Sequence, residues 1–225
     1  MRDHGPVLPF LLLLLTVVAG AVDAVSFLAL GHVFVVNMTG NIVFLGFAAA
    51  GVTEISLTAT ATAIGAFLVG SVAGGRLARR FANERLLSVA AAVKIALIAA
   101  ALIVVVIVHG SLVAGPREVV IALLALAMGL QNASARRIGI PDLTTTVLTM
   151  TLTALAADST PAGGTNPRWM WRALAVGAML VGAFAGGFCI LHAGIAAALV
   201  LVLIMLAVTA ILGHVAFRPL PSAAG

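Results

Sequence analysis

The stretch GAFLVGSVAGG at residues 65–75 recurs as GAMLVGAFAGG at residues 177–187, with eight of eleven positions identical. The first copy begins at Gly65 and the second at Gly177, so each half of the chain carries one copy. This spacing indicates an internal duplication, with one half at residues 1–112 and the other at residues 113–225. Duplicated halves are typical of membrane transporters, in which the solute path runs between the two repeats.

The composition of both halves points to a lipid bilayer. Hydrophobic residues make up 63% of the chain and charged residues 8%, and the mean hydropathy is +1.24. A soluble domain has no interior large enough for so many apolar side chains. About 20 apolar residues cross a hydrocarbon core roughly 30 Å thick. Eight apolar stretches approach that length, at residues 8–30, 32–51, 57–77, 88–109, 119–137, 143–157, 171–190 and 193–216.

The positive residues indicate which stretches cross, because arginines and lysines beside membrane spans stay in the cytoplasm. If all eight stretches cross, the arginines divide almost evenly between the two sides. If the second and sixth stretches instead return to the side from which they came, six spans remain and both termini are cytoplasmic. Ten of the twelve positive residues then lie inside, with Arg117 outside and Lys94 near the inner end of a span. The ten are Arg2, Arg76, Arg79, Arg80, Arg85, Arg136, Arg137, Arg168, Arg172 and Arg218.

Three spans per half are an odd number, so the second half enters the membrane upside down relative to the first. The sequence therefore predicts an all-α membrane protein with six transmembrane helices plus two re-entrant or broken segments, arranged as an inverted 3+3 repeat in one integral membrane domain. Re-entrant backbone is tolerated at membrane depth only where it is buried in protein or lines a wet cavity. The functional site is therefore expected at the two re-entrant segments.

Polar residues of the two halves correspond as well, since Asp23 aligns with Asn132 and Thr39 aligns with Thr149. Asp23 is the only carboxylate well inside an apolar stretch. Ionisable residues within a membrane are functional by default, so we interpret Asp23 as a group that carries a proton or pairs with a cation. The alternatives are that Asp23 lies near the outer interface, or that it is a neutral acid that bonds Asn37 or Thr39 and serves only helix packing.

The first re-entrant segment contains NMTGN at residues 37–41, which combines two amides, a hydroxyl and a glycine. The second re-entrant segment is rich in threonine instead. These polar groups either contact a solute or only satisfy backbone groups at a helix break. The candidate substrate-binding or coupling residues are Asp23, Asn37, Thr39, Asn41, Asn132, Thr145 and Thr149.

Two pairs of glycines spaced four residues apart lie inside the repeated stretch. Such pairs permit close contact between helices in lipid. We interpret them as packing surfaces, where the third stretch of each half meets its counterpart or a re-entrant segment. The four glycines are Gly70, Gly74, Gly182 and Gly186.

Catalytic and metal-binding motifs are absent from the sequence, which has no HExxH, CxxC, GxSxG or Walker-type loop and a single cysteine, Cys189. The sequence therefore predicts no enzyme activity, no cofactor and no metal site. The formal charge of +5 is carried by short loops beside the spans, without a long basic run, which argues against nucleic acid as a partner. The expected partners are the lipid bilayer and a small molecule or ion, and a homo-oligomer is left open.

Two blocks of sequence also carry a family resemblance. VDAVSFL with MTGN in the first half, and GLQNA with TTTVLT in the second, resemble the YoaK-like family of small bacterial inner-membrane proteins over nearly the whole chain. The resemblance implies a polytopic protein of the bacterial cytoplasmic membrane, sometimes described as a small permease. It implies no substrate and no catalytic residue, because the family is one of unknown function.

The function that these patterns favour is transport of a small solute across the bacterial cytoplasmic membrane, coupled to protons or cations through Asp23. One alternative is an uncoupled channel for a small solute or ion. Another is a structural or signalling membrane subunit whose polar residues only bond helices together. The sequence leaves the solute, the coupling ion and the oligomeric state undetermined.

Overall fold

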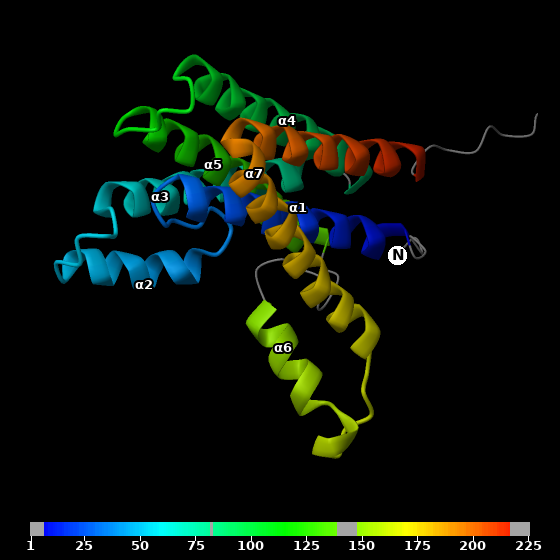
Figure 1. The fold of residues 1–225 in the computed structure, drawn as a ribbon. Coiled ribbons are helices and arrows are strands. Elements are labelled where there is room, and N and C mark those ends of the chain that lie inside the picture. Colours follow the sequence, from blue (N-terminus) through cyan, green and yellow to red (C-terminus); the bar gives the residue numbers. More distant parts are fainter. Residues whose placement is uncertain (1–6, 82, 139–147, 217–225) are drawn as a thin grey trace, which may run out of the picture.

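The computed structural model of the chain describes residues 7–81, 83–138 and 148–216. This described part forms seven α-helices and one short 3-10 helix, without a β-strand (Figure 1), so the predicted all-α class is confirmed. In chain order the elements are α1 (Val7–Ala29), α2 (Met38–Ala49), α3 (Leu57–Arg80), α4 (Asn83–Ile107), α5 (Pro116–Ile138), α6 (Leu148–Ala157), η2 (Thr160–Ala162) and α7 (Trp169–Ala216).

Helix length separates two kinds of element. Within the described residues, α1, α3, α4, α5 and α7 are long and apolar enough to cross a membrane. Helices α2 and α6 have 12 and 10 residues. At a rise of 1.5 Å per residue they span about 18 and 15 Å, which is too short for a hydrocarbon core of roughly 30 Å. The second and sixth apolar stretches of the sequence therefore form short helices.

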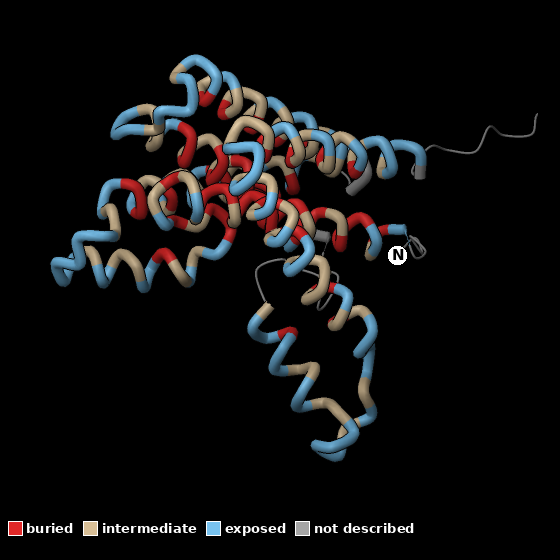
Figure 2. Tube along the Cα trace, in the orientation of Figure 1, coloured by how far each residue is buried: buried red, intermediate tan, exposed pale blue. Residues whose placement is uncertain are grey.

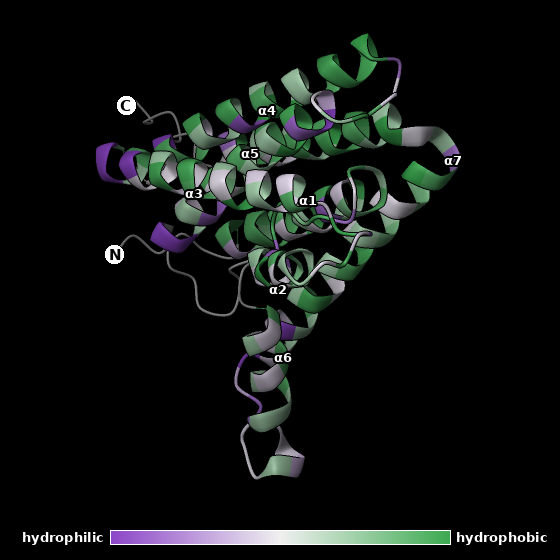
Figure 3. Ribbon diagram, turned by 90° about the vertical axis from the view of Figure 1, so that its left-hand side faces the viewer, coloured by the Kyte–Doolittle hydropathy of each residue, from purple (hydrophilic) through white to green (hydrophobic). Residues whose placement is uncertain are grey.

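Helix α7 joins the last two predicted stretches into one element of 48 residues. Gly194 interrupts it with φ 81° and ψ 177°, a backbone conformation far from that of a helix. Glycine adopts a positive φ without steric cost, and a sharp kink is expected at such a residue. The two arms, residues 169–193 and 195–216, run in different directions from the kink (Figures 1 and 3).

The first long helix of each half lies at the centre of the bundle. In their most apolar windows α1 is 78% buried and α5 is 67% buried, whereas α3, α4 and α7 are each 28% buried. Figure 2 shows the buried residues gathered along α1 and the helices that cross it. The outer helices expose large apolar side chains, as expected for surfaces that face lipid, among them Leu68, Val69, Leu180, Val181 and Phe184.

Glycines allow α3 to cross α5 at close range. A Cβ atom on Gly70 would overlap the carbonyl oxygen of Leu126, and one on Gly74 would meet the carbonyl oxygen of Leu130. From the other side, a Cβ atom on Gly129 would overlap the carbonyl oxygen of Phe67. The two backbones therefore touch, and side chains larger than hydrogen are excluded from the crossing.

Helices α1 and α7 cross in the same manner. A Cβ atom on Gly182 would overlap the carbonyl oxygen of Val17, and one on Gly186 would meet the carbonyl oxygen of Ala21. A Cβ atom on Gly20 would overlap the carbonyl oxygen of Met179.

The two crossings are copies of one another. The alignment that places Gly65 on Gly177 takes the α3 positions of the crossing to those of α7. The alignment that places Asp23 on Asn132 takes the α1 positions to those of α5. Each crossing joins the first long helix of one half to the glycine-rich helix of the other half. The glycine-rich helices thus pack on α1 and α5, whereas the sequence analysis paired them with each other or with a re-entrant segment.

Candidate functional site

Asp23 holds the loop between α1 and α2. Its Oδ1 atom accepts hydrogen bonds from the backbone N–H groups of Val35 at 3.0 Å and Val36 at 2.8 Å, and the residue is 5% exposed. Asp23 lies almost two helical turns before the end of α1, which is about 9 Å along the helix. The loop therefore turns back beside α1 and reaches this depth. Its buried Oδ2 atom has no hydrogen-bond partner within the described part of the chain.

Asn41 fastens the same loop from the α2 side. Its Oδ1 atom accepts from the backbone N–H of Phe34 at 2.9 Å, and its Nδ2 atom donates to the Phe34 carbonyl at 2.5 Å. The ring of Phe34 packs against both Phe27 and Phe44, with centroid distances of 5.0 and 5.8 Å, and these two rings also contact each other at 6.3 Å. Buried backbone groups need such partners, so Asp23 and Asn41 stabilise irregular backbone inside the protein.

The other predicted site residues are more dispersed. Asn37 and Thr39 are exposed at the start of α2, and the Asn37 side chain makes no capping hydrogen bond there. Asn132 is buried in α5, and Thr149 is exposed on α6. Thr145 lies outside the described residues. The structure thus brings Asp23 and Asn41 together on one loop, but their contacts are with its backbone.

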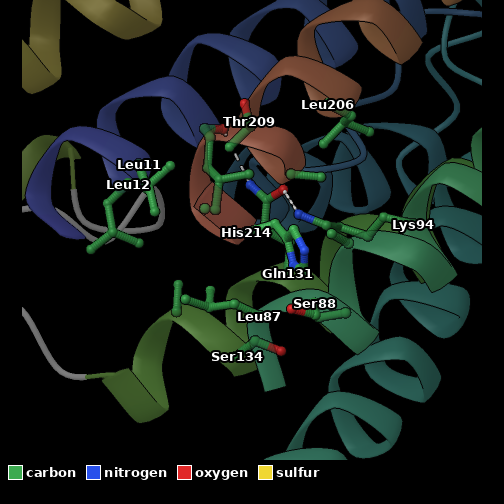
Figure 4. Close-up of a pocket in the computed structure, with 16 residues that line it drawn as sticks. Leu11, Leu12, Leu87, Ser88, Lys94, Gln131, Ser134, Leu206, Thr209 and His214 are labelled. Carbon is green, nitrogen blue, oxygen red and sulfur yellow. Dashed lines mark hydrogen bonds between the residues drawn. The ribbon is translucent and has the colours of Figure 1, made fainter. Parts of the chain in front are cut away.

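A cavity that the sequence analysis did not predict lies among α1, α4, α5 and the second arm of α7 (Figure 4). It encloses about 630 Å³ of space between the helices, part of it open at the surface. Most of its wall is apolar, from residues such as Leu11, Leu12 and Leu206. Its polar lining residues are Ser88, Lys94, Gln131, Ser134, Thr209 and His214.

Lys94 is the most unusual of these lining residues. It is 3% exposed, and its Nζ atom donates to the Gln131 Oε1 atom at 3.0 Å. The Gln131 Nε2 atom in turn donates to the backbone carbonyl of Leu15 at 3.2 Å. This chain of hydrogen bonds connects α4, α5 and α1 beside the cavity (Figure 4).

Lys94 lies deeper along its helix than the predicted stretch at residues 88–109 indicated. Helix α4 begins at Asn83 rather than at residue 88 and ends at Ile107, so Lys94 lies close to its middle. At 1.5 Å per residue this is about 16 Å into the helix. The sequence did contain one indication that Lys94 belongs to a site. It is a single lysine inside an apolar stretch, and ionisable residues at membrane depth are rare.

Lys94 has no acidic partner among the described residues. The ion pairs within this part of the chain are Arg117–Glu118 and Arg172–Asp158, each at 2.7 Å, and both lie away from the cavity. The ammonium group therefore faces the neutral amide oxygen of Gln131. Within the same described part, no cluster of histidine, cysteine or acidic side chains could hold a metal ion.

The cavity lies toward the arginine-bearing ends of its helices. Leu87 and Ser88 follow Arg85 at the start of α4, and Ser134 precedes Arg136 at the end of α5. Because α4 and α5 run in opposite directions through a short connection, these two ends lie on the same side of the bundle.

Comparisons with known proteins also indicate a transmembrane protein. A family model described as "Protein of unknown function (DUF1275)" matches residues 11–212. The UPF0700 transmembrane protein YoaK of Bacillus subtilis (strain 168) is 36% identical over 148 residues, which cover 66% of this chain. The matched region spans 65% of the length of that relative. No solved structure matches the chain.

Proposed function

Because the chain belongs to the DUF1275 family, described as of unknown function, we propose its function from the geometry: it is a permease for a small solute in the bacterial cytoplasmic membrane, and not an enzyme. The observation that carries this proposal is the cavity. It starts at the arginine-bearing side of the bundle and ends at polar side chains near the middle of α4. A cavity that reaches membrane depth from one side fits one state of an alternating-access transporter.

We propose six membrane crossings and two re-entrant segments. Helices α1, α3, α4 and α5 supply four crossings, and the two arms of α7 supply two more. The arms, residues 169–193 and 195–216, span about 37 and 33 Å. Helix α2 and its loop re-enter, because Asp23 holds the loop beside α1 and α2 leads back to the side where α3 begins (Figure 1). Helix α6, equally short, is the matching element of the second half.

The two glycine crossings support an inverted repeat. An operation that exchanges the halves also exchanges the α1–α7 crossing with the α3–α5 crossing, as a twofold axis requires. With three crossings per half, the halves have opposite orientations and the axis lies in the membrane plane. Arginines at the ends of α3 and α5 and at the start of α4 support a cytoplasmic location for that side, and with it for both termini.

Asp23 is the residue that we assign to coupling by protons or cations. Hydrogen bonds to an ionised carboxylate are stronger than those to a neutral group. Protonation of Asp23 would weaken its bonds to Val35 and Val36 and loosen the loop. A change in charge at one buried group would thereby become a movement of the re-entrant segment. Asn41, Asn37, Thr39, Asn132, Thr145 and Thr149 stay candidates for solute contact.

Reconstitution tests this proposal. The full chain is placed in proteoliposomes that contain a pH-sensitive dye, and amino acids, sugars, amines and carboxylates are added in turn across an imposed proton gradient. We expect a saturable flux of at least one solute that depends on the gradient in the wild type and loses this dependence in Asp23→Asn. Linear flux independent of the gradient indicates a channel. Absence of flux above protein-free liposomes for every class contradicts transport and favours a structural or signalling subunit.

A further inference from the structure

We propose that Lys94 and Gln131 bind the carboxylate of a small organic anion, and that the apolar cavity wall holds its carbon skeleton. The inference rests on the proposed function and names the class of solute. It follows from four observations: the buried amine, the apolar wall, the positive residues close in sequence to the lining residues and an asymmetry between the two halves.

The amine of Lys94 has no acidic partner within the part of the chain that the structure describes, and a bound carboxylate would favour its protonated form. An amine near the middle of a membrane helix is costly unless a partner compensates it. Lysine has three N–H donors, of which Gln131 uses one, and the described residues supply no carboxylate for the others. A carboxylate that enters the cavity would provide the missing negative charge in surroundings of low dielectric constant.

The remainder of the cavity selects for a carbon skeleton. Leucine and alanine side chains of α1, α4, α5 and α7 form most of the wall. A hydrated inorganic anion would lose its water there without gaining contacts, whereas an organic anion would place apolar surface against apolar surface. Pockets for small molecules are usually apolar with a few placed polar groups, and the lining of this cavity has that composition.

Positive residues lie close in sequence to residues that line the cavity. Arg85 at the start of α4, and Arg136 and Arg137 at the end of α5, are exposed. They lie within about one helical turn of the lining residues Leu87 and Ser134. Clustered charge of one sign raises the local concentration of the opposite ion, so these arginines favour access by anions from the aqueous phase.

The duplication shows that the fold does not require this polar pair. In the alignment that places Gly65 on Gly177, Lys94 of α4 corresponds to Leu206 of α7, and both are buried. In the alignment that places Asp23 on Asn132, Gln131 corresponds to the buried Val22. The corresponding positions thus hold two buried apolar residues where this site has lysine and glutamine, so the repeated fold does not by itself call for a polar pair here.

Binding to the purified full chain in detergent tests the inference, with radiolabelled benzoate as the probe. Unlabelled benzamide has the same ring without the charge, and benzylamine has the opposite charge. We expect benzoate to bind about 30-fold or more tightly than benzamide, and benzylamine not to compete. Equal affinity for benzoate and benzamide would overturn the proposal without any mutation.

Variants then locate the site. Lys94→Met removes the charge and keeps a long apolar side chain, and we expect a loss of benzoate affinity of about 30-fold or more. Arg79→Gln removes one exposed charge from the same side of the bundle, away from the cavity, and should bind as the wild type does. Unchanged affinity in folded Lys94→Met overturns the assignment. If Lys94→Met does not elute as a folded protein, Lys94→Arg and Gln131→Leu are compared in the same assay, with loss expected only for Gln131→Leu.

Two further results separate this inference from others. Laurate carries the same carboxylate but comes from the bilayer, so binding of laurate without benzoate would overturn access from water. Lys94-dependent binding of benzoate without flux of any solute in proteoliposomes would contradict transport and leave the anion site standing. Saturable flux that does not discriminate benzoate from benzamide, and is unchanged in Lys94→Met, would leave transport standing and overturn the anion site.

Discussion

Asp23 accepts a hydrogen bond of 2.8 Å from the backbone N–H of Val36, which lies 13 residues further along the chain. The bond joins the last third of α1 to the loop that follows it. Backbone without regular structure must find partners when it is removed from water. A side chain of α1 supplies one here, so the loop between α1 and α2 depends on Asp23 as well as on Asn41.

Replacing Asp23 by alanine should therefore destabilise the protein. Two buried N–H groups lose their acceptor, and the expected loss is about 2–4 kcal/mol in the free energy of unfolding. Asp23→Asn keeps an acceptor oxygen and should lose less. Thermal unfolding of the purified protein in detergent measures both changes. Glu54→Gln, which alters an exposed acid in the connection between α2 and α3, is the control and should melt with the wild type. Wild-type stability of Asp23→Ala would show that the loop has other anchors.

The long helices could be predicted closely from the sequence. The expected stretches 8–30 and 57–77 became α1 (Val7–Ala29) and α3 (Leu57–Arg80), because the thickness of the hydrocarbon core sets the length of an apolar run. The union of the last two stretches through Gly194 was not predicted. No polar loop separates them, and only a backbone angle marks the break.

The functional residues were less predictable for a physical reason. The alternative interpretation of Asp23 paired it with the side chains of Asn37 or Thr39, but its hydrogen-bond partners are backbone groups, which have no signature in the sequence. The cavity is formed by four helices from both halves, so its position depends on how the helices cross. Lys94 was recognisable in the sequence as a charged residue inside an apolar stretch. The rule that positive residues stay in the cytoplasm does not account for a lysine at that position.

The two glycine crossings should respond alike to mutation. Gly74→Leu and Gly186→Leu each force a side chain against a neighbouring backbone, and each should lower the free energy of unfolding by about 1–3 kcal/mol or more. Gly65→Leu and Gly177→Leu are matched controls, because both glycines lie in the same repeated stretch with nothing near an added Cβ atom. Monodisperse yield and melting temperature in detergent report the result. Similar losses of stability at all four positions would contradict the close backbone contacts at the two crossings.

The proposed inverted repeat makes a prediction about the membrane side on which each connection lies. On a Cys189→Ala background, Arg79→Cys at the end of α3 and Arg137→Cys at the end of α5 should react with an impermeant maleimide only in inverted vesicles. Ser111→Cys, in the connection between α4 and α5, should react in intact cells. All three positions are exposed, so access depends on the membrane side. Labelling of Arg79→Cys and Arg137→Cys from opposite sides would exclude the inverted arrangement.

Gly194 provides the test of the sixth crossing. Its φ of 81° and ψ of 177° belong to a region that residues with a side chain avoid at a cost of about 1–3 kcal/mol. Gly194→Ala should therefore lower the melting temperature, although nothing lies near the added methyl group. Gly177→Ala is the matched control in the same helix, where helical glycine gives way to alanine with a gain of about 0.5–1 kcal/mol. If Gly194→Ala also raised the melting temperature, the residue would be helical, α7 would run straight, and the two arms could not form two crossings.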